Sequence, residues 1–271
     1  MTPTYPRVPA GDERRAPVLA WRDGGIAHLR FNRPDALNAI DTAMAAGFAR
    51  AVEALARDAA VRVVVLAGEG RAFQAGGDIG AMQADPVRIA AELIEGMHGA
   101  LRRLAALDAP VIASVHGAVA GGGLGVLLSC DLALAAEGTR FAIAYPAIGA
   151  SADCGTTWGL ARIVGLRQAL RIALLAEPFD AAEALRLNLV NAVVPATELE
   201  ACTLEWARRI EASAPRALGR LKHLLRGAGE RGFEAQLDAE AQAFAACAAT
   251  ADFAEGTAAF LGKRVARFTG R

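Results

Sequence analysis

Apolar and polar residues alternate with two different periods along the first half of the chain. Residues 18–22 and 26–31 alternate about Asp23-Gly24-Gly25, which predicts two strands joined by a tight turn. Asp41 then precedes apolar residues at helical spacing, and the uninterrupted apolar run at 61–67 predicts a buried strand. The later elements are a helix over 86–107, a strand over 111–115, a helix beginning at 124–128 and a strand over 132–135. Such a series indicates an α/β fold with mostly parallel strands.

From Thr156 onward the pattern becomes almost entirely helical. Helices are expected over 156–164, 166–175, 181–187, 199–210 and 215–225, with one short strand over 190–194. The alanine-rich tail, 233–267, is amphipathic and either covers its own chain or packs on another subunit. We therefore expect a disordered N-terminal extension (1–17), an α/β core (18–195) and a helical C-terminal region (196–271).

The composition is that of a globular protein whose charges balance. Hydrophobic residues make up 54% of the 271 residues, and 29 Lys plus Arg match 29 Asp plus Glu, so the formal net charge is zero. Neither nucleic acid nor a membrane surface is an expected partner. Four separated cysteines without a CxxC pair favour reduced thiols over a disulfide frame or a zinc site. Reduced thiols make the cytoplasm the expected location. No apolar run approaches the roughly 20 residues that span a bilayer, so no membrane segment is expected.

Two glycine-rich segments directly follow predicted strands. Gly68–Ile79 reads GEGRAFQAGGDI, and Gly121–Gly123 lies within AVAGGGLG. Glycine lets the backbone approach a ligand, and N–H groups at a helix start suit an oxygen that gains negative charge. The alternative is two tight turns without chemistry. Neither segment has the spacing of GxxxxGK[ST] or GxGxxG, which disfavours nucleotide hydrolysis and dinucleotide redox chemistry.

Five segments together resemble the crotonase superfamily, the enoyl-CoA hydratase/isomerase family. They are FNRPDALNAID (31–41), GEGRAFQAGGDI (68–79), HGAVAGGGLGVLLSCDLALA (116–135), LARIVG (160–165) and DFAEGTAAFLGKR (252–264). The resemblance covers nearly the whole chain and implies a crotonase-like core of the ββα-superhelix type. It also implies an acyl-coenzyme A substrate, no separate cofactor or metal, and a homotrimer or a dimer of trimers.

The same resemblance assigns binding roles. The backbone N–H groups of Gly77 and Gly122 would form an oxyanion hole for the thioester carbonyl. The coenzyme A site would be lined by residues of the first two motifs, namely Ala36, Leu37, Ala75, Asp78 and Ile79. Phe260 and Lys263 in the tail match positions that reach coenzyme A, often that of a neighbouring subunit.

Two positions depart from the family's hydratases. Those enzymes use one glutamate two residues after the GGG cluster and another in an FGxPE segment, where this chain has Gly125 and Tyr145. Without two carboxylates to position and deprotonate a water, hydration by the usual route is not expected. Tyr145 is expected either to orient the acyl group or to form pocket wall.

Asp153 remains as the candidate catalytic carboxylate. The matching position holds an aspartate in enoyl-CoA isomerases, where it moves an allylic proton, and in chlorobenzoyl-CoA dehalogenases, where it attacks an aromatic ring. The dehalogenases also use a histidine on the preceding helix. His98 falls roughly two helical turns after that matching position, which argues against dehalogenation. Alternatively, Asp153 caps the helix expected at Thr156.

The leading hypothesis is an enoyl-CoA isomerase in which Asp153 shuttles a proton on an enolate held by Gly77 and Gly122. The alternatives are an unconventional hydratase, an aspartyl-nucleophile dehalogenase or thioesterase-like enzyme, and a non-catalytic acyl-CoA-binding subunit. Other polar residues are interpreted structurally: Glu92 and Glu95 as a solvated helix face, His116 as a packed or surface residue, Cys154 as a partly accessible thiol, and Lys222 and His223 as solvent-exposed.

Overall fold

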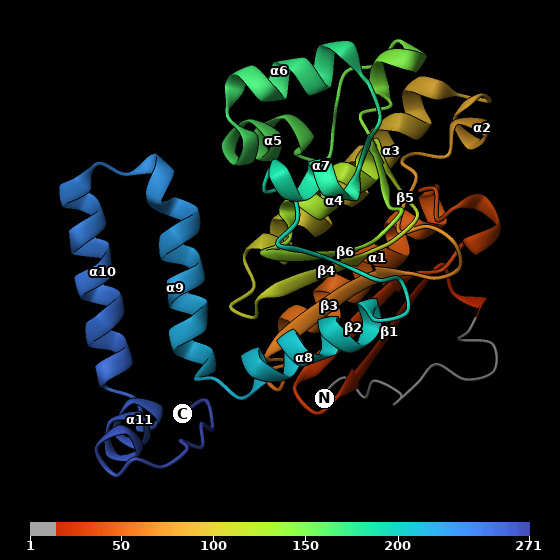
Figure 1. Ribbon diagram of the computed structural model, residues 1–271. Coiled ribbons are helices and arrows are strands. Elements are labelled where there is room, and N and C mark those ends of the chain that lie inside the picture. The colour runs from red at the N-terminus through yellow and green to blue at the C-terminus, as the bar shows by residue number, and fades with distance from the viewer. Residues whose placement is uncertain (1–14) are drawn as a thin grey trace.

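The computed structural model describes residues 15–271 and is organised around a six-stranded sheet (Figure 1). In spatial order its strands are β1 (Val18–Asp23), β2 (Ile26–Phe31), β3 (Val63–Gly68), β4 (Val111–Val115), β6 (Leu132–Ala136) and β9 (Ala192–Val194). β1 and β2 form an antiparallel hairpin, whereas the remaining neighbours pair in parallel. The hairpin and the parallel crossovers confirm the predicted α/β fold.

Side chains of β3 alternate between two hydrophobic clusters. Val64 and Leu66 belong to the larger cluster, and Val63 and Val65 to the smaller one. This is the two-residue period of a strand covered on both faces, and every residue of β3 is buried. Double coverage therefore explains why the sequence shows an uninterrupted apolar run here.

Helices cover both faces of the sheet (Figure 1). α1 (Thr42–Arg57) and α3 (Pro86–Ala105) pack against each other beside the larger cluster. α8 (Leu199–Glu211) contacts β3, β4 and β6 beside the smaller cluster. As predicted, the Asp41 carboxylate caps α1, because its Oδ1 accepts a hydrogen bond from Met44 N at 2.8 Å.

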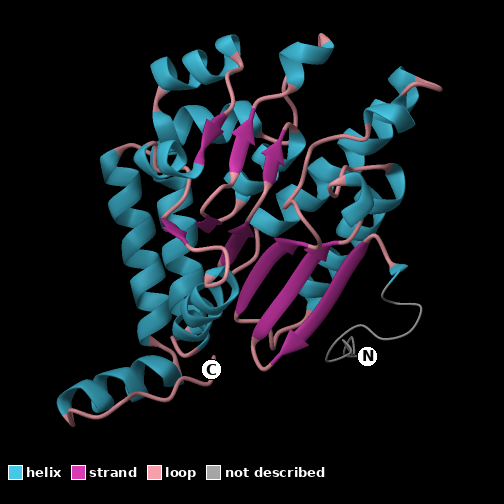
Figure 2. Ribbon diagram, turned by 45° about the vertical axis from the view of Figure 1, so that its right-hand side comes forward, coloured by secondary structure: helices cyan, strands magenta, loops and turns pink. Residues whose placement is uncertain are grey.

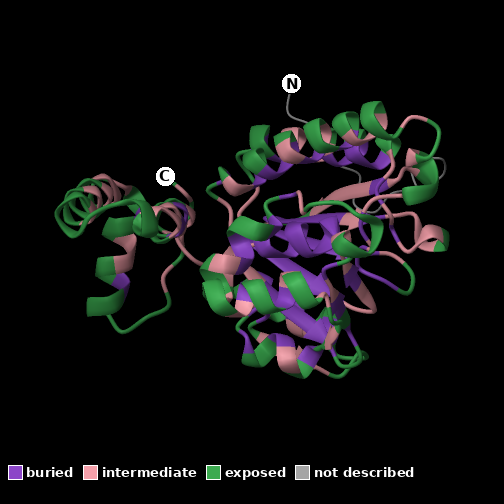
Figure 3. Cartoon of the chain, turned by 90° about the horizontal axis from the view of Figure 1, so that it is seen from above, coloured by how far each residue is buried: buried purple, intermediate pink, exposed green. Residues whose placement is uncertain are grey.

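The helix that follows the second glycine segment, α4 (Gly122–Ser129), lies inside the larger cluster. All of its residues except Ser129 are buried, as the purple centre of Figure 3 shows. Four more α-helices and two 3-10 helices belong to this part: α2 (Ile79–Met82), α5 (Thr156–Val164), α6 (Leu166–Leu175), α7 (Ala181–Arg186), η2 (Pro34–Ala36) and η3 (Tyr145–Ile148). α4 is thus a rigid platform for whatever binds at its first turn.

The sequence pattern did not predict a second, three-stranded sheet. It consists of β5 (Ala118–Ala120), β7 (Arg140–Ala142) and β8 (Phe179–Asp180), which are too short to show a period. Figure 2 shows these strands beyond one end of the long strands. Because β5 and β7 closely follow β4 and β6, the small sheet extends the carboxyl end of the large one towards the glycine-rich loops.

The last helices, α9 (Pro215–Gly227), α10 (Phe233–Ala248) and α11 (Ala251–Leu261), stand beside the α/β core (Figures 1 and 3). Asp131 ties α9 to the core, with Lys222 Nζ 3.0 Å from its Oδ2 and Arg226 Nη2 2.7 Å from its Oδ1. Lys222 is buried, so the prediction of an exposed lysine is wrong. Its long stem reaches a carboxylate distant in sequence, which no local pattern reveals. The His223 side chain is 42% exposed, as predicted.

The structure can be compared with the predicted N-terminal extension and with the predicted C-terminal region. Residues 1–14 of the predicted extension lie outside the described residues, while Ala16 and Pro17 accept hydrogen bonds from Asn32. Because α8 packs on the sheet, the region 196–271 combines one helix of the core with three that stand apart. Within 15–271, no helix has both the length and the apolar character needed to cross a membrane.

Candidate active site

The two glycine-rich loops meet beyond the carboxyl end of the main sheet. Gln74 and Val119 form a β-bridge between them. A Cβ atom on Gly76 would lie 3.2 Å from Ala120 O and 3.6 Å from Gly122 N. Gly76 also has a φ of +96°, so both the space and the backbone conformation require glycine. The loop after β3 is therefore held directly against the start of α4.

Two backbone N–H groups at this junction have no acceptor within residues 15–271. Ile40 N donates to Gly76 O at 2.8 Å, and Asp78 N donates to Ile40 O at 2.9 Å. This bridge leaves the N–H of Gly77 unused. Gly122 is the first residue of α4, so its N–H has no partner inside the helix. Both groups are free to donate to an oxygen of a ligand.

Asp153 lies next to this junction, on the loop between η3 and α5. Its Oδ1 is 3.8 Å from the position of a Cβ atom on Gly122. The same oxygen accepts a hydrogen bond of 2.5 Å from the Tyr145 hydroxyl. Burial, and then the bond to Asp153, raise the pKa of Tyr145, so the phenol stays protonated and remains the donor. One carboxylate is thus held beside a free N–H group.

The interpretation of Asp153 as a helix cap is wrong. α5 begins after Gly155, which has a φ of +72° and forms no side-chain cap. Thr156 N donates to the backbone carbonyl of Asp153 at 2.9 Å, not to its carboxylate. The side chain is therefore available for another role, and its hydroxyl partner, Tyr145, is eight residues earlier in the sequence.

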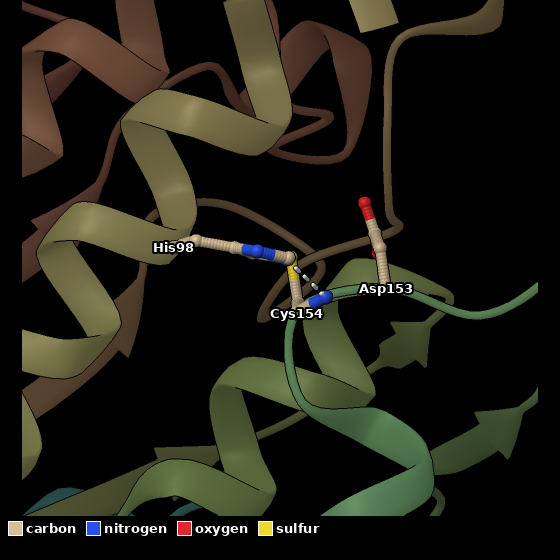
Figure 4. Close-up of side chains that lie close together, drawn as sticks. All are labelled: His98, Asp153 and Cys154. Carbon is tan, nitrogen blue, oxygen red and sulfur yellow. Dashed lines mark hydrogen bonds between the residues drawn. The ribbon is translucent and has the colours of Figure 1, made fainter. Parts of the chain in front are cut away.

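His98 on α3 reaches the same loop (Figure 4). The Cys154 N–H donates to His98 Nε2 at 3.1 Å, so Nε2 is unprotonated and Nδ1 carries the ring hydrogen. The ring therefore lies beside the loop that carries Asp153. The offset of His98 by two helical turns from the position of the dehalogenase histidine concerns the sequence match and stays a prediction.

Cys154 is buried, contrary to the expected partial exposure. Burial raises the pKa of its thiol, and the neighbouring Asp153 raises it further, so the sulfur stays protonated. His98, Asp153 and Cys154 offer ring nitrogen, carboxylate oxygen and sulfur within 4.8 Å of one another. Two of these atoms already accept hydrogen bonds and the third holds its proton, so the cluster is a hydrogen-bonded arrangement and not an open ligand set.

Gly125, at the position of a hydratase glutamate, has no room for a side chain. A Cβ atom there would lie 2.6 Å from both Cys154 O and Thr156 Oγ1. Both distances are shorter than any real Cβ contact, and one of them is to backbone. The loop that carries Asp153 therefore occupies the space into which a residue at position 125 would project.

The residues predicted to line the coenzyme A site lie on two adjoining loops. Ala36 ends η2, and the next residue, Leu37, accepts a hydrogen bond from Ala75 N at 3.2 Å. Asp78 caps α2, and Ile79, its first residue, is 43% exposed. The structure thus brings these five residues together beside Gly77.

Arg33 and Asn38, which the sequence analysis did not single out, hold these loops together. Arg33 Nη2 lies 3.0 Å from Asp78 Oδ2, and its Nε lies 3.3 Å from Asp41 Oδ2. A hydrogen bond from Ala81 N, supported by Arg33, lowers the pKa of Asp78. Asn38 is fully buried and donates to three carbonyls of the loop after β3. Both residues belong to the 31–41 motif, but only the fold shows what they contact.

Phe260 and Lys263 are not brought to these loops by their own chain. Phe260 is 84% exposed and Lys263 is also exposed. Figure 1 shows α11 and α2 at opposite ends of the molecule. Phe260 instead borders a cavity of about 460 Å³ among the last three helices. Their predicted contact with coenzyme A therefore requires a second copy of the chain.

The remaining polar candidates keep structural roles. Glu92 and Glu95 are exposed on α3, as predicted for a solvated face. His116 is partly buried, and its Nε2 lies 2.9 Å from Gly70 O, which ties the turn before β5 to the first glycine-rich loop. The Glu92 carboxylate accepts a hydrogen bond from Arg88 on the same helix.

Known proteins share both the sequence and the fold. The enoyl-CoA hydratase/isomerase family matches residues 22–271. A 1,2-epoxyphenylacetyl-CoA isomerase of Escherichia coli K12 is 34% identical, covering 94% of this chain and 98% of its own. A 2,3-dehydroadipyl-CoA hydratase of the same organism is 35% identical over 94% and 99%. The structure of an enoyl-CoA hydratase from Polaromonas sp. JS666 superposes with a TM-score of 0.89, at 32% identity over 93% of this chain and 99% of that one. The chain therefore belongs to the enoyl-CoA hydratase/isomerase family of the crotonase superfamily.

Proposed function

We propose that this protein shifts the double bond of an enoyl-CoA from the β,γ to the α,β position, with Asp153 as the single acid–base group. The observation that carries the proposal is the placement of one carboxylate, held by Tyr145, beside the free N–H of Gly122. Proton removal and return need one such group, whereas the family's usual hydration needs two.

In the proposed reaction, the thioester carbonyl oxygen accepts hydrogen bonds from Gly77 N and Gly122 N. Asp153 Oδ2, the carboxylate oxygen that Tyr145 does not bond, takes a proton from C2 of the 3-enoyl thioester. The electrons of that C–H bond form a dienolate whose negative charge lies on the held oxygen. Asp153 then returns the proton to C4, which leaves the double bond between C2 and C3 and restores the carbonyl.

Tyr145 has a positioning role in this proposal. Its hydroxyl remains protonated because burial raises its pKa, so it donates to Asp153 Oδ1 and fixes the carboxylate plane. The other oxygen is then left to face the substrate. The chemistry requires no cofactor other than the coenzyme A of the substrate.

The closed space at Gly125 supports isomerisation over hydration. A glutamate at this position would collide with Cys154 O, so the second carboxylate of a hydratase has no place in this arrangement of the loop. Relatives carry both hydratase and isomerase names, so the proposal depends on the residues of this chain. Because Phe260 and Lys263 lie apart from the loops, we also propose that a neighbouring copy supplies them in a homotrimer or a dimer of trimers.

The direct test is conversion of a 3-enoyl-CoA to the conjugated 2-enoyl-CoA, followed by its ultraviolet absorbance. Asp153→Asn should lower kcat by about 10²-fold or more, because general acid–base groups contribute that much. Binding of a saturated acyl-CoA should remain within a few-fold of the wild type. Asp238→Asn, on an exposed position of α10, is the matched control. Equal isomerisation by Asp153→Asn and the wild type would refute the proposal.

A second candidate is an aspartyl-nucleophile reaction, and the position of His98 beside Asp153 favours it. Here the carboxylate would attack a carbon of the acyl group, displace a leaving group and form an ester that water then cleaves at the aspartyl carbonyl. Against it, the His98 Nε2 lone pair is already engaged by Cys154 N–H and is not free to activate water. Single turnover in ¹⁸O-water with a halogenated aromatic acyl-CoA distinguishes the two, because only the nucleophile mechanism leaves label in the Asp153 carboxylate.

A further inference from the structure

We infer that His98 is a positioning residue that holds the Asp153 carboxylate in place through the Cys154 N–H, and does so only while its imidazole is neutral. The inference rests on the proposed function, since Asp153 is the group positioned. It assigns His98 no contact with the substrate.

The first observation is the hydrogen bond itself. His98 Nε2 accepts from Cys154 N at 3.1 Å, and this N–H belongs to the peptide that joins Cys154 to Asp153 (Figure 4). No other acceptor for this N–H exists within residues 15–271. The hydrogen bond therefore fixes the peptide plane from which the catalytic side chain departs.

The second observation is the backbone conformation of Cys154 and of the residue that follows it. Cys154 has a φ of +50° and Gly155 a φ of +72°. A left-handed conformation is unfavourable for cysteine, and it persists only where the surroundings hold it. His98 bonds Cys154 from α3, and α4 approaches the same residue so closely at Gly125 that a Cβ atom there would collide with Cys154 O.

The third observation is the position of Cys154 between the site and His98. Its Sγ lies 3.4 Å from the Cβ position of Gly122, so a movement of this residue also displaces the wall beside the predicted oxyanion hole. A shift of about 1 Å in a reacting group can cost about 10²-fold in rate. The bond to His98 therefore controls the geometry of Asp153 and Gly122 together.

Protonation of His98 breaks this arrangement. A charged imidazole carries hydrogen on both nitrogens, so Nε2 would face the Cys154 N–H as a second donor. The ionisable groups around the ring are Asp153 and the protonated Cys154 thiol on the loop, Arg102 on α3 and Arg226 on α9. Arg102, Arg226 and Cys154 line one cavity with His98. Asp153 belongs to the cluster with His98 and Cys154. Activity should accordingly fall at pH values low enough to protonate the ring.

The test compares kcat and KM against pH for the wild type, His98→Gln and His98→Ala. A glutamine oxygen can accept from Cys154 N–H but does not titrate, so His98→Gln should keep kcat within about threefold at pH 8. It should lose the part of the acidic fall that His98 causes and keep the part caused by protonation of the Asp153 base. His98→Ala should lower kcat roughly 10- to 100-fold at every pH, with KM within about twofold. His223→Gln on α9 is the matched control and should retain the wild-type profile. An unchanged acidic fall in His98→Gln, or an unchanged kcat in His98→Ala, would overturn the inference.

A second measurement separates this inference from the proposed function. In the ¹⁵N-labelled wild-type protein, which has four histidines, NMR should identify His98 as the tautomer with hydrogen on Nδ1 and an accepting Nε2. The opposite tautomer would overturn the inference even in an active enzyme. If the expected tautomer is found but the wild type isomerises no enoyl-CoA, the positioning geometry stands and the proposed reaction fails.

Discussion

Gly125→Ala and Gly99→Ala should change stability in opposite directions, although both replace a glycine within a helix. At Gly99, on α3, a Cβ atom would meet no atom within 4 Å. Alanine should therefore stabilise the protein there by about 0.5–1 kcal/mol, through helix propensity alone.

At Gly125 the same gain in propensity is opposed by collision. The new Cβ atom would lie 2.6 Å from Cys154 O, 2.6 Å from Thr156 Oγ1 and 2.7 Å from Cys154 Cβ. Overpacking of this kind costs about 1–3 kcal/mol, so the net result is a loss of up to about 2 kcal/mol. Because the loop must move, isomerisation should also fall, by roughly 10-fold or more.

Urea unfolding measures the change in stability, through the midpoint at constant m-value. The absorbance of the conjugated 2-enoyl-CoA product measures the change in the isomerisation rate. Gly99→Ala supplies the matched control for both. If Gly125→Ala is as stable as Gly99→Ala and fully active, the Asp153 loop does not pack on α4 as described, and the steric case against hydration fails.

Three further changes test separate parts of the account. Asp131→Asn should cost about 3–5 kcal/mol of unfolding free energy, measured by urea, because it leaves the buried Lys222 ammonium without its carboxylate. Tyr145→Phe should lower kcat roughly 10-fold without raising KM, as measured by initial rates, because it removes the hydrogen bond that orients the carboxylate. The bond from Arg264 lowers the pKa of Glu255 to about 2 from its ordinary value of 4.5. The extra stability of the wild type relative to Glu255→Gln should therefore be fully present above pH 4.5 and be lost as the pH falls through 2. Unfolding measured at a series of pH values across that range checks it.

Each of these three predictions would be contradicted by one result. An Asp131→Asn protein as stable as the exposed control Asp238→Asn would mean that α9 is not anchored by the buried pair. A normal kcat for Tyr145→Phe would remove the tyrosine from the mechanism. A stability difference for Glu255→Gln that persists undiminished as the pH falls through 2 would show that the carboxylate contributes through something other than its charge.

Local patterns predicted those elements whose neighbours in space are also neighbours in sequence. The Asp41 cap is satisfied three residues away by Met44, and the apolar run of β3 reports its burial on both faces. The small sheet was invisible because its strands have two or three residues, and their pairing joins segments far apart in the chain.

The same contrast between local and distant contacts holds for the candidate site. Motifs indicated the glycine-rich loops and Asp153, because the resemblance is carried by short stretches of sequence. The contacts of His98 and Lys222 were not predictable, since each side chain bonds a partner on another element: Cys154 in the first case and Asp131 in the second. Only the packing of α3 and α9 against the core shows these contacts.

The most direct test of the central claim follows deuterium from C2 to C4. A 3-enoyl-CoA deuterated at C2 is incubated in ordinary water, and the 2-enoyl product is analysed by mass spectrometry with positional fragmentation. If Asp153 both removes and returns the proton, part of the deuterium should appear at C4, and Asp153→Asn should abolish both transfer and product while Asp238→Asn retains them. Product formed by Asp153→Asn with undiminished transfer would contradict the assignment of Asp153 as the acid–base group.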